Sequence, residues 1–109
     1  DEISPYAKTN VIQLKDNKIS EIVIDPKELK INADKFENLV GDDAKFNAEK
    51  MINIFKGEDN DFSKAVCLNA AAGLIVNENH KEFTEAYKNA REHILSNKVI
   101  KHLETIQNA

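Results

Sequence analysis

The pattern of hydrophobic and polar positions predicts an extended first part of the chain and a helical second part. Over residues 10–24, apolar residues lie on both sides of the polar stretch Asp16-Asn17-Lys18. Because Asp and Asn readily adopt the backbone angles of a tight turn, this pattern predicts a β-hairpin. Two strands alone are marginal in water, so we expect the hairpin to need a further surface to pack against. Its apolar positions are Val11, Ile12, Leu14, Ile19, Ile22, Val23 and Ile24.

Two short turns are expected between the hairpin and the helical part. The first begins at Asp25-Pro26, because proline cannot continue a strand ladder but suits the first position of a helical turn, with Asp25 as its cap. The second covers residues 34–39. Three apolar side chains of this region are expected to point inward: Phe36, Leu39 and Val40.

Four helices are expected after Gly41. Asp42 or Asp43 is the expected cap of the first helix and Gly57 its end, since glycine adopts the left-handed conformation that stops helices. Its apolar positions recur at the spacing of one helix face. They are Ala44, Ala48, Met51, Ile52 and Phe55. The third and fourth helices are amphipathic, with one buried side each. Their apolar positions are Phe83, Ala86, Tyr87, Ala90 and Ile94 in the third, and Val99, Ile100, Leu103 and Ile106 in the fourth.

The second helix covers residues 62–76, follows Asn60 or Asp61 as its cap, and is apolar on nearly every side. A helix that is hydrophobic all round belongs in the middle of a packed body. Asn69 is the polar exception, and a buried amide must find hydrogen-bond partners. We expect Asn69 to bind the backbone of a neighbouring loop, with contact to a ligand as the alternative.

Composition and charge narrow the class of protein. A chain of 109 residues, 41% hydrophobic and 31% charged, is sized for one folded domain. Its longest apolar run is well short of the roughly 18 to 20 residues that a membrane span needs. The net charge is -4 and the lysines are scattered, which argues against nucleic acid as a partner. A single cysteine, Cys67, offers no disulfide and indicates a cytoplasmic protein.

Few residues are candidates for catalysis, phosphate binding or metal binding. The three histidines lie on separate predicted elements and are expected to be solvated. Cys67 has no histidine at helical spacing, which favours a small core residue over a nucleophile. The glycines form no phosphate-binding loop. No residue is predicted to be catalytic or to bind an organic cofactor. The adjacent carboxylates Asp1 and Glu2 could hold Mg²⁺, which commonly takes one or two carboxylates together with water and phosphate; a simply solvated pair is the alternative.

Four segments together resemble the C-terminal part of the anthranilate phosphoribosyltransferase family. Any one of them is weak, but their order and spacing together are fairly specific, and the match covers essentially the whole chain. The segments are Asp1-Glu2-Ile3-Ser4-Pro5, Asp25-Pro26-Lys27-Glu28-Leu29, Gly41-Asp42-Asp43-Ala44 with Asn47-Ala48, and Ala65-Val66-Cys67-Leu68-Asn69-Ala70-Ala71-Ala72.

The resemblance implies a fold and a reaction. It implies that residues 1–109 are the C-terminal part of the α/β catalytic domain of a phosphoribosyltransferase / nucleoside-phosphorylase-like enzyme. In this part the arrangement is α+β, a hairpin from a larger sheet followed by about four packed helices. The implied enzyme is a glycosyltransferase of tryptophan biosynthesis that transfers the phosphoribosyl group from phosphoribosyl pyrophosphate to anthranilate. Asp1 and Glu2 are implied to bind Mg²⁺ on the pyrophosphate of the donor.

The resemblance also implies what this chain lacks. In the family, the glycine-rich donor loop, the anthranilate-binding residues and an N-terminal helical region that forms a homodimer all precede the Asp-Glu pair. The isolated chain is therefore expected to be inactive and to need the remainder of its own chain as a partner. The run Ala7-Lys8-Thr9 departs from the Gly-Pro-Thr often found in the family. Three alternatives remain open: a non-catalytic paralogue of the same fold acting as a binding module, a free-standing interaction domain, and a related phosphorylase of similar architecture, which fits the Asp-Glu-x-Ser and Leu-Asn-Ala-Ala segments less well.

Overall fold

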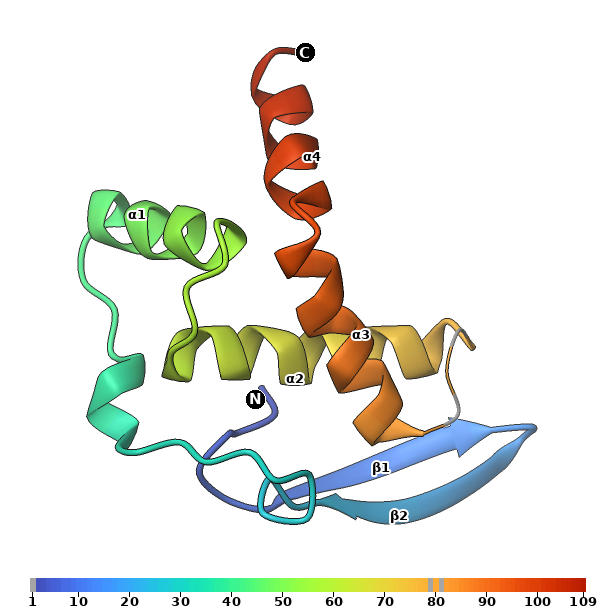
Figure 1. The fold of residues 1–109 in the computed structure, drawn as a ribbon. Coiled ribbons are helices and arrows are strands. Elements are labelled where there is room, and N and C mark those ends of the chain that lie inside the picture. Colours follow the sequence, from blue (N-terminus) through green and yellow to red (C-terminus); the bar gives the residue numbers. More distant parts are fainter. Residues whose placement is uncertain (1, 79, 81) are drawn as a thin grey trace.

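The computed structural model describes residues 2–78, 80 and 82–109 (Figure 1). A two-stranded antiparallel sheet is followed by a short 3-10 helix and four α-helices, which confirms the predicted α+β arrangement. The elements are β1 (Thr9–Lys15), β2 (Lys18–Ile24), η1 (Phe36–Leu39), α1 (Ala44–Phe55), α2 (Asp61–Val76), α3 (Phe83–Leu95) and α4 (Lys98–Gln107). None of the described helices is long and apolar enough to cross a membrane.

The hairpin forms where the sequence predicts it. Its two-residue turn consists of Asp16 and Asn17, with φ angles of 51° and 61°, and Lys18 already belongs to β2. A turn with two positive φ angles matches the right-handed twist of the flanking strands. The register pairs Leu14 with Ile19, and these side chains are 71% and 75% exposed. The described part of the chain therefore leaves most of the hairpin's apolar surface in water.

Helix α2 lies in the middle of the helical part, and α3 crosses it (Figure 1). Cys67, Leu68 and Ala71 on α2 are fully buried, which confirms the predicted central helix. Asn60 is its cap: Asn60 Oδ1 accepts a hydrogen bond from the Ser63 amide, and Ser63 Oγ accepts one from the Asn60 amide. This reciprocal pair satisfies two of the donors that a helix start leaves open.

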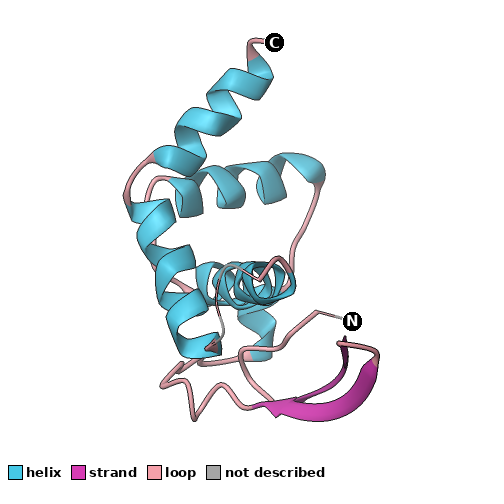
Figure 2. Ribbon diagram, turned by 90° about the vertical axis from the view of Figure 1, so that its right-hand side faces the viewer, coloured by secondary structure: helices cyan, strands magenta, loops and turns pink. Residues whose placement is uncertain are grey.

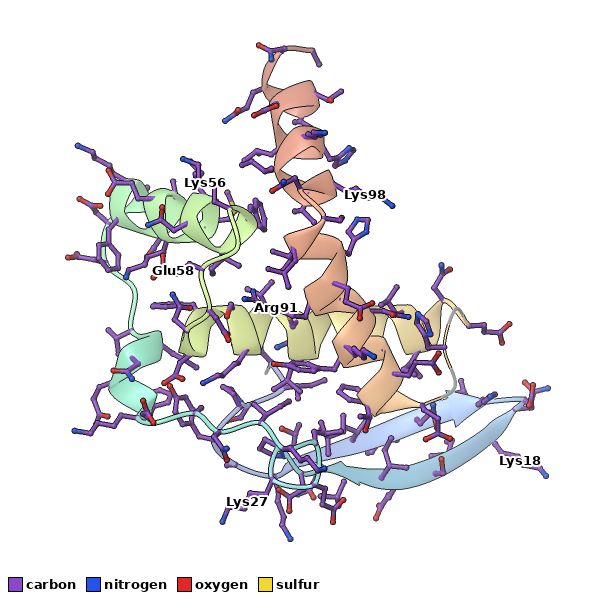
Figure 3. All side chains as sticks on the ribbon, viewed as in Figure 1. Lys18, Lys27, Lys56, Glu58, Arg91 and Lys98 are labelled. Atoms are coloured by element: carbon purple, nitrogen blue, oxygen red, sulfur yellow. The ribbon has the colours of Figure 1, made fainter. Side chains whose placement is uncertain are left out.

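The loop between α1 and α2 is held by α3. Gly57, with a φ of 106°, ends α1 as predicted. Arg91 reaches this loop from α3, and its Nη2 donates a hydrogen bond to the Gly57 carbonyl at 3.1 Å (Figure 3). The same nitrogen lies 3.9 Å from a carboxylate oxygen of Asp59. The start of α2 is thereby tied to the middle of α3.

The predictions about burial in η1 and α1 are wrong in part. Phe36 and Val40 do not point inward and are 69% and 59% exposed; the Tyr6 ring meets the Phe36 ring edge-on, at 6.3 Å between centroids, and leaves most of Phe36 in solvent. In α1, which Asp43 caps, Ala44 and Ala48 are exposed and the one buried residue is Ile54. The reason is that α1 meets the other helices through its C-terminal end, where Ile54 joins the core, rather than along a whole face.

Helix α4 projects away from the rest of the molecule in two perpendicular views (Figures 1 and 2). Its predicted apolar face is only partly covered: Val99, Ile100 and Leu103 are half-buried, and Ile106 is 59% exposed. No residue of α4 is fully buried. The hairpin and α4 thus leave apolar surface exposed at opposite ends of the molecule.

Candidate functional site

Of the two predicted metal ligands, the structure describes Glu2, and Asp1 lies outside the described residues. Glu2 is exposed to solvent. A hydrogen bond from its own backbone amide to the carboxylate lowers the pKa of the Glu2 carboxyl. The segment that follows, residues 3–8, runs beside α2 (Figure 1). The site is therefore built by attaching this segment to α2.

Asn69 makes the first attachment. The Ile3 amide donates a hydrogen bond to Asn69 Oδ1 at 2.9 Å, and Asn69 Nδ2 donates one back to the Ile3 carbonyl at 3.1 Å. Asn69 Nδ2 also donates to the Ala65 carbonyl one turn earlier in α2, at 2.9 Å. These contacts confirm the prediction that Asn69 binds the backbone of a neighbouring loop.

A tight turn follows Ile3. Ser4 Oγ accepts hydrogen bonds from the amides of Tyr6 and Ala7, at 3.1 and 3.3 Å. The Ser4 amide donates to Thr9 Oγ1 at 3.2 Å, and Pro5 between them is buried. Serine side chains commonly stabilise turns in this way. The turn directs the chain from the Glu2 segment into β1.

Asp61 makes the second attachment. Its Oδ2 accepts hydrogen bonds from the Tyr6 hydroxyl at 2.9 Å, from Asn38 Nδ2 at 3.0 Å and from the Asp34 amide at 3.1 Å. Lys64 Nζ lies 3.3 Å from Oδ1. Asp61 is only 6% exposed. One buried carboxylate therefore joins α2, the N-terminal segment and the η1 region.

Burial and hydrogen bonding together determine the ionisation states of Asp61 and Tyr6. Burial opposes the charge on the carboxyl, but the hydrogen bonds from its four donors outweigh burial and lower the pKa of Asp61 to about 2. Burial and the adjacent Asp61 carboxylate raise the pKa of Tyr6 to about 12. Tyr6 therefore keeps its proton and Asp61 keeps its charge at neutral pH, which is the state that the hydrogen bond between them requires.

Sequence reasoning missed this cluster. Asp61 was expected only as an alternative cap, and no role was expected for Tyr6. The adjacent pair Asn60-Asp61 is a signal that could have found it, because one residue suffices to cap a helix and the second acid is then available for another contact.

The other candidates stay outside the site. Cys67 is fully buried, and burial raises the pKa of its thiol, which confirms a core residue. His93 and His102 are exposed as predicted. The prediction is wrong for His80, which is half-buried, with Asn89 Nδ2 lying 3.0 Å from its Nε2. Contacts of the His80 ring with Asn89 and Glu85, both on α3, account for this difference.

Metal binding by this chain would rest on its N-terminal carboxylates. The described residues contain no group of three or more His, Cys, Asp or Glu side chains placed to hold a metal ion. An ion that takes one or two carboxylates and completes its shell with water and phosphate needs no such group. The exposed, charged Glu2 suits that type of site, and Asn69 holds the residue next to it.

Comparison with known proteins identifies the family that this chain resembles. A sequence model described as "Glycosyl transferase family, a/b domain" matches residues 1–99. The anthranilate phosphoribosyltransferase of Pelagibacter ubique (strain HTCC1062) is 71% identical over 108 residues, which are 99% of this chain and 33% of that protein. The enzyme of the same name from Thermoanaerobacter sp. (strain X514) is 40% identical over 88 residues, 81% of this chain and 26% of that protein. The chain thus spans about a third or less of the length of these curated relatives.

Proposed function

The chain belongs to the glycosyl transferase family, a/b domain, and from this we propose that it is the C-terminal part of an anthranilate phosphoribosyltransferase. Such an enzyme transfers the phosphoribosyl group from phosphoribosyl pyrophosphate to anthranilate, a step of tryptophan biosynthesis. The observation that carries the proposal is the 71% identity over nearly the whole chain to a protein of that name. We place the enzyme in the cytoplasm, in keeping with the lone buried cysteine.

Asp1 and Glu2 are the proposed contribution of this chain to the reaction. Their carboxylates would hold the Mg²⁺ that accompanies the pyrophosphate of the donor. A bound Mg²⁺ neutralises the negative charge that develops on pyrophosphate as it leaves the ribosyl carbon. The two carboxylates hold and orient; they neither donate nor abstract a proton. The exposed position of Glu2 supports this role.

The remaining parts of the site come from the rest of the proposed enzyme. A donor-binding loop, the anthranilate-binding residues and the surface of a homodimer lie outside residues 1–109. The exposed apolar side chains of the hairpin, such as Ile12 and Leu14, pack against that remainder. The isolated chain is therefore inactive, and it regains activity only when joined to the remainder.

A full-length hybrid tests this function. In the hybrid, this chain replaces the matching third of the Pelagibacter ubique enzyme, to which it is 71% identical. We expect the hybrid to form phosphoribosyl anthranilate and the isolated chain to form none. Asp1→Ala and Glu2→Ala in the hybrid lower kcat/KM by roughly 10²-fold or more, because Mg²⁺ loses a ligand. Glu21→Ala, at an exposed acid of β2, is the matched control and leaves activity unchanged.

Two results would contradict the proposal. Product formation by the isolated chain would mean that the chain is a complete enzyme. A folded hybrid that binds phosphoribosyl pyrophosphate without turnover would instead indicate a non-catalytic binding module of the same fold.

A further inference from the structure

We propose that Asn69 is a positioning residue, which places the Glu2 carboxylate for cation binding by holding the backbone of Ile3 against α2. The inference rests on the proposed function, because it assigns Asn69 to the same cation site. Asn69 touches neither substrate nor metal in this proposal and acts through the Ile3 backbone.

The geometry of the contact fixes Ile3 in two directions. Asn69 both accepts from the Ile3 amide, at 2.9 Å, and donates to the Ile3 carbonyl, at 3.1 Å. A single hydrogen bond would let the segment pivot, whereas two bonds on the same residue also restrict its rotation. The peptide that joins Glu2 to Ile3 is planar, and it keeps neighbouring Cα atoms about 3.8 Å apart. Fixing the Ile3 backbone therefore confines the Glu2 Cα to a narrow range, from which its side chain extends.

The orientation of the Asn69 amide is itself determined. The third hydrogen bond, from Asn69 Nδ2 to the Ala65 carbonyl at 2.9 Å, uses the second amide hydrogen. Nδ2 must therefore face Ala65 and the Ile3 carbonyl, and Oδ1 must face the Ile3 amide. An aspartate at this position would offer no donor to either carbonyl. A side-chain amide is the group that satisfies all three partners.

The anchor is rigid because one side of its helix is buried. Leu68, beside Asn69, and Ala71, two residues later, have no exposed surface. A second attachment lies eight residues earlier on the same helix, where Asp61 accepts from the Tyr6 hydroxyl. The two anchors are about 12 Å apart along the helix, at about 1.5 Å per residue. Helix α2 thus holds residues 3–6 at both ends.

Substitution of Asn69 distinguishes a positioning role from a general role in stability better than substitution of Asp61 does. Asp61 also binds the Asp34 amide and Asn38, so its loss would disturb the η1 region as well. The two hydrogen bonds that Asn69 makes outside its own helix both go to Ile3. Asn47, on α1, offers a matched control. Its side-chain amide accepts from the Asp42 amide and donates to the Asp42 carbonyl, both at 3.1 Å, and Asp42 lies in the exposed loop before α1.

The test compares Asn69→Ala with Asn47→Ala in the full-length hybrid. Binding of Mn²⁺ in the presence of inorganic pyrophosphate, followed by electron paramagnetic resonance, reports the cation site without turnover. We expect Asn69→Ala to weaken Mn²⁺ binding about 10-fold, and Asn47→Ala to leave it unchanged, because residues that orient metal ligands typically contribute 10- to 100-fold in affinity. Hydrogen exchange at the Ile3 amide should accelerate in Asn69→Ala alone. Asn69→Gln keeps an amide but misplaces it, so it should also weaken Mn²⁺ binding.

The outcomes distinguish failure of the inference from failure of the proposed function. If Asp1→Ala and Glu2→Ala abolish Mn²⁺ binding while folded Asn69→Ala and Asn69→Gln bind it as the parent does, Asn69 has a structural role only and the inference is overturned. If the carboxylate variants themselves bind Mn²⁺ unchanged, the proposed cation site is wrong. If Asn69→Ala does not fold, the result of Asn69→Gln decides.

Discussion

Helix α2 and the β1–β2 hairpin are both rich in aliphatic residues, yet they differ in how much of that surface they bury. Leu68 on α2 has no exposed surface, whereas Leu14 on β1 is 71% exposed. One side of helix α2 is covered within the chain, mainly by α3, although Val66 and Val76 stay exposed, while the hairpin has no third strand or covering helix among the described residues. The difference shows that the local sequence determines whether a helix or strand forms, whereas the burial of its side chains depends on which other elements pack against it.

The two regions also differ in how they connect to the rest of the molecule. Helix α2 carries polar anchors, Asn69 and Asp61, that reach the N-terminal segment and the η1 region. In the hairpin, Thr9 at the start of β1 receives the hydrogen bond from the Ser4 amide. Because α2 combines a buried core with these anchors, it determines where the Glu2 segment lies.

The largest expected effect on stability comes from truncating a buried side chain of the core. Leu68→Ala should lower the free energy of unfolding by about 3 kcal/mol, through lost burial and the cavity left behind. Leu14→Ala should change it by less than about 0.5 kcal/mol in the isolated chain, because Leu14 is already in water. Urea unfolding followed by circular dichroism measures both. In the full-length hybrid, Leu14→Ala should become costly, by about 2 kcal/mol, if the remainder covers the hairpin. Equal costs for both variants in the isolated chain would refute the contrast.

Removing the charge of the second anchor should have the next largest effect. In Asp61→Asn, an amide replaces the carboxylate and faces the groups that donate hydrogen bonds to the carboxylate in the parent chain. This change should lower the free energy of unfolding by about 2 kcal/mol. Asp42→Asn is the control, since Asp42 is exposed and its hydrogen bonds use only its backbone. Its cost should stay below about 0.5 kcal/mol. A similar small cost for Asp61→Asn would mean that the buried cluster does not hold the segment.

The same carboxylate predicts a dependence on pH. The pKa of Asp61 falls from 3.8, its ordinary value, to about 2 in the folded state, so the unfolded chain binds more protons between these values. Stability is therefore complete above about pH 4 and falls as the pH drops towards 2, by about 2 kcal/mol at 1.36 kcal/mol per unit. Urea unfolding at pH 5, 4, 3 and 2 would measure this loss. Asp61→Asn should lack it, and an unchanged pH profile in that variant would assign the loss to other groups.

Features that depend on neighbouring residues could be predicted from the sequence. The hairpin turn, the stop at Gly57 and the capped starts of α1 and α2 each follow from contacts within a few positions, although the sequence left two adjacent candidates for each cap. The need of Asn69 for a partner could also be predicted, because an amide in an apolar run must be satisfied. Its partner Ile3 could not be named, since 66 residues separate the two and no local pattern links them.

Burial and distant polar contacts could not be predicted in this way. Phe36 and Val40 are apolar like core residues, yet they are 69% and 59% exposed, although the Tyr6 ring lies edge-on to Phe36. Periodicity placed Ala48 on the inner face of α1, whereas the way α1 meets its neighbours buries Ile54 instead. The role of Asp61 depends on partners up to 55 residues away, so its position at a helix start suggested only a cap.

The smallest effect should arise in the hairpin turn, and it sharpens the contrast between the two regions. Asn17 has a φ of 61°, which alanine adopts at a cost of about 1 kcal/mol, whereas glycine adopts it freely. Asn17→Ala should therefore speed hydrogen exchange of the β1 and β2 amides about fivefold, and Asn17→Gly should leave it unchanged or slow it. Because the hairpin shares little core with α2, amides around Leu68 should exchange as before in both variants. Faster exchange there would show that the hairpin supports α2 and that the two regions unfold together.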